Sequence, residues 1–254
     1  MKKAISYTIV FLGIQMLAGG LVNAVVGLSG HSEWLSSPYV AIATMVLASL
    51  TTLIVFVWAR WACPTKDYLL SHPWTVVAWS VVAALGVVLP SIYVQEQMPE
   101  LPNLVEQEMG QIMDTRGGYL VICLLAPLIE ELVMRGAVLR SLLAWKPGQR
   151  WAMIAVSALF FALIHLNPAQ MPHAFVMGLL LGWMYERTGS IVPGVAFHWA
   201  NNTVAYVLYK LYPDPDIRLT DILGSDRQAL MAVGFSLCIL LPAIYQLWLR
   251  MRRP

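Results

Sequence analysis

Long apolar blocks recur along this chain of 254 residues. Each block is about 20 residues long, the length that an α-helix needs to cross a hydrocarbon core of roughly 30 Å. Charged residues make up only 12% of the chain and hydrophobic residues 59%, against about 25% and 45–50% in a globular domain. So few charges could not cover the surface of a water-soluble protein. The sequence therefore predicts a polytopic membrane protein and excludes collagen-like, disordered, disulfide-scaffold and nucleic-acid-binding classes.

The apolar windows predict an all-α transmembrane bundle of about eight membrane-spanning helices. They lie at about residues 5–27, 38–62, 74–95, 117–142, 151–166, 171–186, 190–211 and 228–249. Seven spans are the alternative, because the fifth and sixth windows are short and a tight break at Asn167-Pro168 separates them. We find no internal repeat at a fixed period. We expect residues 1–254 to form a single integral membrane domain.

The distribution of charge predicts the orientation in the membrane, because Lys and Arg collect in cytoplasmic loops. With the N-terminus inside, most basic residues beside the windows, including Lys2, Lys3 and Arg140, fall on the cytoplasmic side. The acidic loop 96–116 then falls on the opposite side. Both termini are therefore predicted to be cytoplasmic. The first apolar run continues to about Leu28 without an obvious cleavage site, so we expect a retained span and not a cleaved signal peptide.

Ionisable residues inside the predicted spans stand out because each costs several kcal/mol at bilayer depth. Glu131 and Arg135 lie four residues apart in the fourth window, so they share a helical face and can form an ion pair. Glu130 is rotated by about 100° from Glu131 and points elsewhere. A structural salt bridge would explain Glu131 and Arg135, but it would not explain Glu130, which suits a general base.

Two histidines in later windows repeat the four-residue spacing. Phe161 and His165 are predicted to share one helical face, and His198 and Asn202 another. A lone histidine in a membrane is often a hydrogen-bonded core residue, so each pair alone is weak evidence. Together with Glu130, they place one carboxylate, two imidazoles and one amide on three spans. This combination predicts an intramembrane active site.

Three motifs contain these residues, in a fixed order along the chain. They are Glu-Glu-x-x-x-Arg at 130–135, Phe-x-x-x-His at 161–165 and His-x-x-x-Asn at 198–202. Their combination resembles the CAAX-protease and bacteriocin-processing (CPBP, or Abi) family of intramembrane proteases, which includes the type II CAAX prenyl endopeptidases. The resemblance covers about residues 117–210, which we expect to contain the catalytic core.

The resemblance implies hydrolysis of a peptide bond within or near the membrane. Glu130, helped by His165, would activate a water to attack the scissile carbonyl. His198 and Asn202 would stabilise the oxyanion, as pre-placed hydrogen-bond donors do in acyl transfer. The residues implied to support the site are Glu131, Arg135 and Phe161.

The residue types leave the role of a metal open. Glu130, His165 and His198 would satisfy the three protein ligands of a catalytic zinc site. The chain has no His-Glu-x-x-His motif, however, and no thiolate that would add affinity at this site. We favour a glutamate mechanism without a required cofactor, and a divalent metal such as zinc is the alternative.

The expected partners are the lipid bilayer and a substrate that is a membrane protein or a lipidated peptide; no nucleic acid is expected. If the source is bacterial, the chain would lie in the cytoplasmic (inner) membrane, and a literal prenyl substrate would not be expected. One alternative function is a non-catalytic membrane scaffold or bacteriocin-immunity protein with the same fold. Another is a proton-coupled transporter, which the lack of repeats disfavours.

Overall fold

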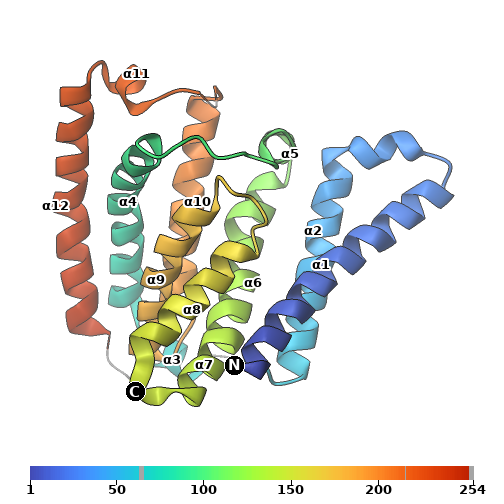
Figure 1. The fold of residues 1–254 in the computed structure, drawn as a ribbon, viewed down its shortest axis with the longest axis horizontal. Coiled ribbons are helices and arrows are strands. Elements are labelled where there is room, and N and C mark those ends of the chain that lie inside the picture. Colours follow the sequence, from blue (N-terminus) through green and yellow to red (C-terminus); the bar gives the residue numbers. More distant parts are fainter. Residues whose placement is uncertain (63–65, 215, 252–254) are drawn as a thin grey trace. The chain divides into compact units, whose positions relative to one another are not determined.

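The computed structural model describes residues 1–62, 66–214 and 216–251, and all regular secondary structure in these ranges is helical (Figure 1). This confirms the all-α prediction for the described residues. The longer helices are α1 (Lys2–Leu28), α2 (Pro38–Trp58), α4 (Trp74–Glu96), α8 (Arg150–Leu163), α9 (Met171–Thr188), α10 (Val192–Leu211) and α12 (Asp226–Arg250). The shorter helices are α3 (Lys66–Leu70), α5 (Glu106–Asp114), α6 (Ala126–Val133), α7 (Arg140–Trp145) and α11 (Leu219–Leu223).

Four helices are long and apolar enough to cross a membrane: α1, α2, α4 and α12. Their lengths of 21 to 27 residues correspond to about 30–40 Å at 1.5 Å per residue. Large apolar side chains on these helices are exposed, as a lipid-facing surface requires; Met16 and Leu17 on α1 are 78% and 74% exposed. The chain is therefore an integral membrane protein by the length and composition of these helices.

The other four predicted windows also contain helices, but these helices are shorter or more polar than α1. Helix α8 has only 14 residues, about 21 Å, which is shorter than the hydrocarbon core. Helix α9 ends with the charged pair Glu186-Arg187, and α10 carries His198 and two asparagines. These polar residues lower the mean hydropathy of the two helices. Eight spans with both termini in the cytoplasm remain a prediction.

The fourth window is one helical run, 118–145, in which two π-helical segments interrupt the α winding. A π-helical segment, η2 (Leu120–Leu125), precedes α6, and a second, η3 (Met134–Leu139), follows it. Pro127 lies at the start of α6 and has no backbone N–H, so it cannot continue the regular hydrogen-bond ladder. Wider turns next to a proline accommodate the missing bond, and π-turns of this kind are frequent at functional sites.

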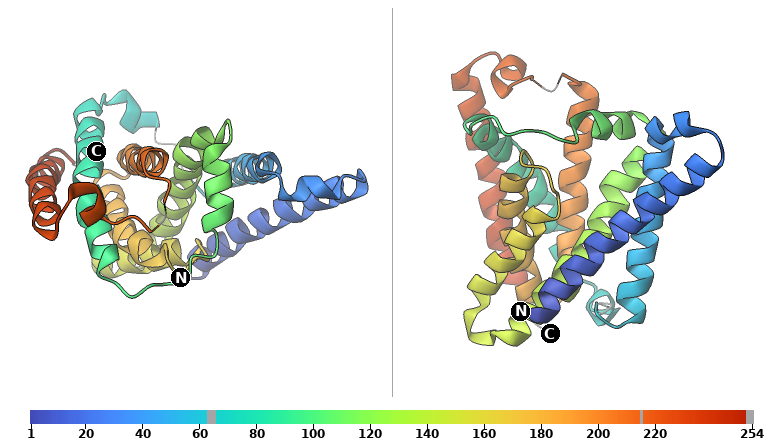
Figure 2. Two further views of the ribbon diagram at one scale, coloured as in Figure 1. Left: turned by 90° about the horizontal axis from the view of Figure 1, so that it is seen from above. Right: turned by 45° about the vertical axis from the view of Figure 1, so that its right-hand side comes forward.

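The chain divides into two compact units, and each is described by itself. The first contains residues 1–64 and 103–182. In it, α1 and α2 form a hairpin joined by the short helix η1 (Ser32–Ser36) (Figures 1 and 2). Helix α1 packs on η3 and α2 packs on α6, and α8 also packs on η3. The helical run 118–145 is therefore the centre of the first unit.

Close packing in the first unit depends on a glycine in α9. A Cβ atom on Gly178 would lie only 2.9 Å from the Cα of Ala158 in α8. This distance shows that the backbones of α8 and α9 approach where neither residue has a large side chain, as small residues permit in membrane helices.

The second unit contains residues 65–102 and 183–254, and α4 is its centre. Helix α4 packs against both α10 and α12. The Ser236 hydroxyl of α12 donates a hydrogen bond of 3.2 Å to the carbonyl oxygen of Gly86 in α4. The expectation of a single integral membrane domain remains a prediction alongside this division.

Candidate active site

Glu130 and His165 line the same cavity in the first unit, although 34 positions separate them in the sequence. Glu130 comes from α6, and His165 comes from the turn after α8. The cavity has a volume of about 170 Å³, which leaves room for water. Its other lining residues are Phe11, Gln15, Met45, Ser49, Ala126, Ile129 and Ile164. A carboxylate and an imidazole therefore line one cavity, together with apolar residues of α1, α2 and α6.

His165 lies just beyond α8 and not within a helix. The sequence pattern predicts that Phe161 and His165 share a helical face, but α8 ends at Leu163. Leu166 then adopts a left-handed conformation with φ of 51°, which is costly for a residue with a side chain. The next residue, Asn167, precedes Pro168, and a residue before proline disfavours the α conformation. The helical prediction is therefore wrong at His165, because α8 ends two residues before it and the chain turns at Leu166.

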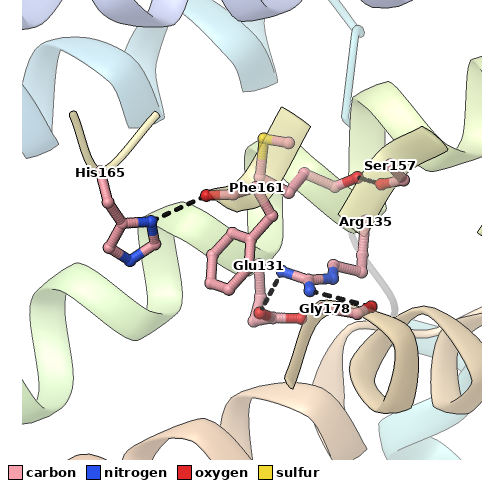
Figure 3. Close-up of polar contacts among 7 residues, drawn as sticks. Glu131, Arg135, Ser157, Phe161, His165 and Gly178 are labelled. Atoms are coloured by element: carbon pink, nitrogen blue, oxygen red, sulfur yellow. Dashed lines mark hydrogen bonds and ion pairs between the residues drawn. The ribbon is translucent and has the colours of Figure 1, made fainter. Parts of the chain in front are cut away.

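The turn holds the His165 ring by a hydrogen bond to the helix that it leaves. The Nδ1 atom of His165 lies 2.7 Å from the carbonyl oxygen of Phe161, near the C-terminus of α8 (Figure 3). A carbonyl oxygen only accepts, so Nδ1 carries the proton of this bond. In the neutral ring, the lone pair is then on Nε2. The contact leaves Nε2 as the nitrogen that can accept a proton or a hydrogen bond.

Glu131 and Arg135 form the ion pair predicted from their spacing. Nη1 of Arg135 lies 2.7 Å from Oε1 of Glu131, and the two side chains are 1% and 0% exposed. Nη2 of Arg135 also donates to the carbonyl oxygen of Gly178 at 3.4 Å. Two charges buried this deeply are tolerated only when they are paired. The pair thus ties the helical run 118–145 to α9.

A row of contacts connects this ion pair to His165 (Figure 3). The guanidinium carbon of Arg135 lies 4.3 Å from the centre of the Phe161 ring, a cation–π distance. The edge of one ring faces the other between Phe161 and His165, whose ring centres are 5.0 Å apart. Phe161 therefore contacts both Arg135 of the ion pair and His165. This position suits the supporting role predicted for it.

Asn167 is a buried polar residue that the sequence patterns did not single out. Its side chain is 0% exposed. Its Oδ1 accepts a hydrogen bond of 2.9 Å from the backbone N–H of Leu104, and its Nδ2 donates one of 2.9 Å to Oδ1 of Asn103. These bonds fasten the turn after His165 to the segment before α5. The available signal was an asparagine two residues after His165 and directly before a proline, and it indicated only a chain break.

His198 and Asn202 lie one turn apart on α10, in the second unit. His198 is buried, with 7% of its surface exposed, and Asn202 is partly buried. Their spacing on one helix agrees with the shared face predicted from the sequence. Their gathering with Glu130 and His165 into one site remains a prediction.

The candidate metal ligands do not form a complete set in the first unit. Glu130 and His165 supply two donors, whereas a catalytic zinc site uses three protein ligands. Across the described ranges, no group of three or more His, Cys, Asp or Glu side chains is close enough to hold a metal ion. Among the described residues, Glu130 and His165 therefore do not complete a metal site.

Residues 115–204 match the family model described as Type II CAAX prenyl endopeptidase Rce1-like. The matched segment is about a third of the chain and contains all three motifs. The resemblance drawn from the motifs is therefore confirmed over this segment. No curated protein and no solved structure matches the chain. Because the matched family is a family of proteases, the match supports protease activity in general.

Proposed function

We propose that this protein is an intramembrane endopeptidase of the CAAX-protease type. Its substrate would be a membrane-associated or lipidated protein or peptide. The observation that carries the proposal is the cavity that Glu130 and His165 share in the first unit. A carboxylate beside an imidazole with Nε2 available is a suitable pair for activating water.

In the proposed reaction, a water molecule in the cavity attacks the scissile carbonyl carbon. Glu130 takes a proton from this water, and Nε2 of His165 accepts a hydrogen bond that orients it. The carbonyl oxygen becomes an oxyanion, to which His198 and Asn202 donate hydrogen bonds. Glu130 then passes its proton to the leaving amine, and the carbon–nitrogen bond breaks. The carboxyl product and the amine product balance the water that was consumed.

The surroundings of Glu130 and His165 support this chemistry. Most of the lining residues are apolar, and hydrogen bonds and charges act more strongly where bulk water is excluded. The Phe161 carbonyl holds the His165 ring, so orienting this imidazole requires little rearrangement during the reaction. The buried ion pair and Phe161 would keep this geometry from changing as substrate enters.

The test measures release of peptide by the full chain purified in detergent. The variants are Glu130→Gln, His165→Ala and His198→Ala. General acid–base groups contribute about 10²–10⁴-fold and oxyanion donors about 10²–10³-fold, so each variant should lose at least 100-fold in kcat.

The control variants are Glu108→Gln and His31→Ala, which change an exposed carboxylate and an exposed imidazole away from the cavity. Both controls should cleave at the wild-type rate, and all five variants should keep the wild-type unfolding temperature. Unchanged cleavage by either Glu130→Gln or His198→Ala would contradict the assignment. If Glu130→Gln keeps the biological activity of the protein intact, the chain acts as a scaffold or immunity protein and not as an enzyme.

A further inference from the structure

A second and larger cavity lies in the first unit, at the N-terminal end of α1. It has a volume of about 700 Å³, within the range of roughly 300–1,000 Å³ usual for ligand pockets. One wall is the first two turns of α1, and the other is formed by η3 and α7. It shares no lining residue with the cavity that contains Glu130 and His165. It is therefore separate from the cavity of the proposed peptidase site.

The charged side chains among the described residues that line this cavity are all basic. Lys2 and Lys3 come from α1 and Arg140 from the start of α7. Among the residues that the structure describes, no aspartate or glutamate lines it. Of the two carboxylates on the same helical run, Glu131 is bonded to Arg135, and Glu130 lines the other cavity. Three basic side chains on one cavity favour an anionic ligand, and an arginine fork matches the oxygens of a phosphate group.

The remaining walls are apolar and aromatic. Tyr7 and Trp145 line the cavity, together with the alanines of η3 and α7. Tyr7 is held against Trp61, with ring centres 5.1 Å apart, so this wall is fixed. Tyrosine and tryptophan are enriched where hydrocarbon meets the headgroups of a bilayer. A small soluble anion would leave these walls without a partner, whereas a lipid has an apolar part that contacts them.

The position of the cavity fits the same class of ligand. α1 is one of the four helices able to cross a membrane, and its first turn is where it would leave the hydrocarbon. Ile5 and Ile9, one and two turns further along, are 42% and 62% exposed. An acyl chain that leaves the cavity would find apolar surface on the same helix. Basic pockets between helix ends are typical binding sites for anionic lipid headgroups.

We propose that the cavity formed by Lys2, Lys3, Tyr7, Arg140 and Trp145 binds the phosphate group of an anionic membrane lipid. Arg140 and the two lysines contact the phosphate oxygens, and Tyr7 and Trp145 contact the glycerol and the start of the acyl chains. The lipid fills the space between α1 and α7 at the end of the helical run that carries Glu130. It therefore fastens the α1–α2 hairpin to this run.

Native mass spectrometry of the full chain, titrated with phosphatidylglycerol or phosphatidylcholine of the same acyl composition, tests the proposal. The variant is Lys3→Gln/Arg140→Gln. The matched control, Arg116→Gln/Arg227→Gln, removes the same charge from two exposed positions outside the cavity. Each basic residue near an anionic headgroup contributes several-fold, so the cavity variant should bind phosphatidylglycerol about tenfold or more weakly. The control should bind as the wild type does, and phosphatidylcholine binding should not change in either.

Three results would overturn the proposal. The first is equal affinity of the wild type for the two lipids. The second is an equal loss of phosphatidylglycerol binding in the cavity variant and in the control, which would indicate a general effect of net charge. The third is displacement of the lipid by millimolar inorganic phosphate, which would assign the cavity to a soluble anion. A folded cavity variant is recognised by its wild-type unfolding temperature in a zwitterionic detergent without added lipid.

Discussion

Asn167 offers the sharpest test of how the first unit holds His165. In Asn167→Ala, the side chain that joins the turn after α8 to the segment before α5 is removed. Two hydrogen bonds of 2.9 Å are lost, one from the Leu104 N–H and one to Asn103. The alanine leaves a small void where a fully buried side chain was.

The expected loss of stability follows from these two bonds. Each contributes about 0.5–1.5 kcal/mol net, so the free energy of unfolding should fall by about 1–3 kcal/mol. For a chain of this size, 1 kcal/mol corresponds to about 2–4 °C in the unfolding temperature. Thermal unfolding in detergent should therefore show a decrease of about 2–12 °C. Asn103→Ala removes only one of the two bonds and should show about half of this decrease.

Activity should change more than stability does. The left-handed Leu166 lies between His165 and Asn167, so the loosened turn can relax toward a less strained conformation and move the imidazole. A displacement of about 1 Å can cost about 10²-fold in rate. We expect kcat to fall by at least tenfold with little change in KM, measured below the unfolding temperature of the variant. Asn167→Asp keeps the acceptor for the Leu104 N–H and should retain more activity than Asn167→Ala. A wild-type unfolding temperature together with a wild-type kcat in Asn167→Ala would refute this reasoning.

Three further predictions address charge, protonation and metal. Replacing Arg135 by Met leaves Glu131 buried without its cation, so the free energy of unfolding should fall by about 3–5 kcal/mol. The double variant Glu131→Gln/Arg135→Met should recover much of that loss, and a double variant as unstable as the single one would contradict a role for the ion pair. Burial raises the pKa of Tyr68, in α3 outside the candidate spans, from 10.0 to about 12. Because the folded state holds this proton more tightly, the stabilisation is present below pH 10 and is lost as pH rises through about 12. Absorbance at 295 nm in wild type and Tyr68→Phe should differ by a titration step near pH 12, and a step near pH 10 would contradict the effect of burial. Cleavage should persist in excess chelator under the glutamate mechanism, whereas loss in chelator with recovery on added zinc would establish a metal enzyme.

The apolar pattern of the sequence predicted where helices form, because a run of about 20 apolar residues has few stable structures other than a helix in a bilayer. It predicted the pairing of Glu131 with Arg135 for an equally local reason, since residues four apart on a helix are neighbours. Both predictions depend on the chain only within a few turns. This is why the structure has helices in the predicted windows and contains the predicted ion pair.

The features that the sequence did not reveal depend on distant parts of the chain. Asn167 is explained by its partners 63 and 64 positions earlier, and no local spacing points to them. The end of α8 before His165 is the exception, because its cause is local: Leu166 is left-handed, and leucine rarely adopts this conformation, so the sequence does not signal it. The shared cavity of Glu130 and His165 likewise requires α1 and α2, which lie outside the segment that resembles the protease family.

Two π-helical segments, η2 and η3, lie on either side of α6, the helix that carries Glu130 and Glu131. Each π-turn contains one more residue than an α-turn would need. Deleting one residue from η2 would restore regular α winding there, and α6 would face almost the same way, because the wide turn takes up the extra residue. Deleting one residue from the α winding of α6 before Glu130 would instead turn Glu130 and Glu131 by about 100° relative to the start of the run. Glu131 would then take the direction in which Glu130 now lies. The π-turn therefore tolerates a change in length that the α-helix beside it does not.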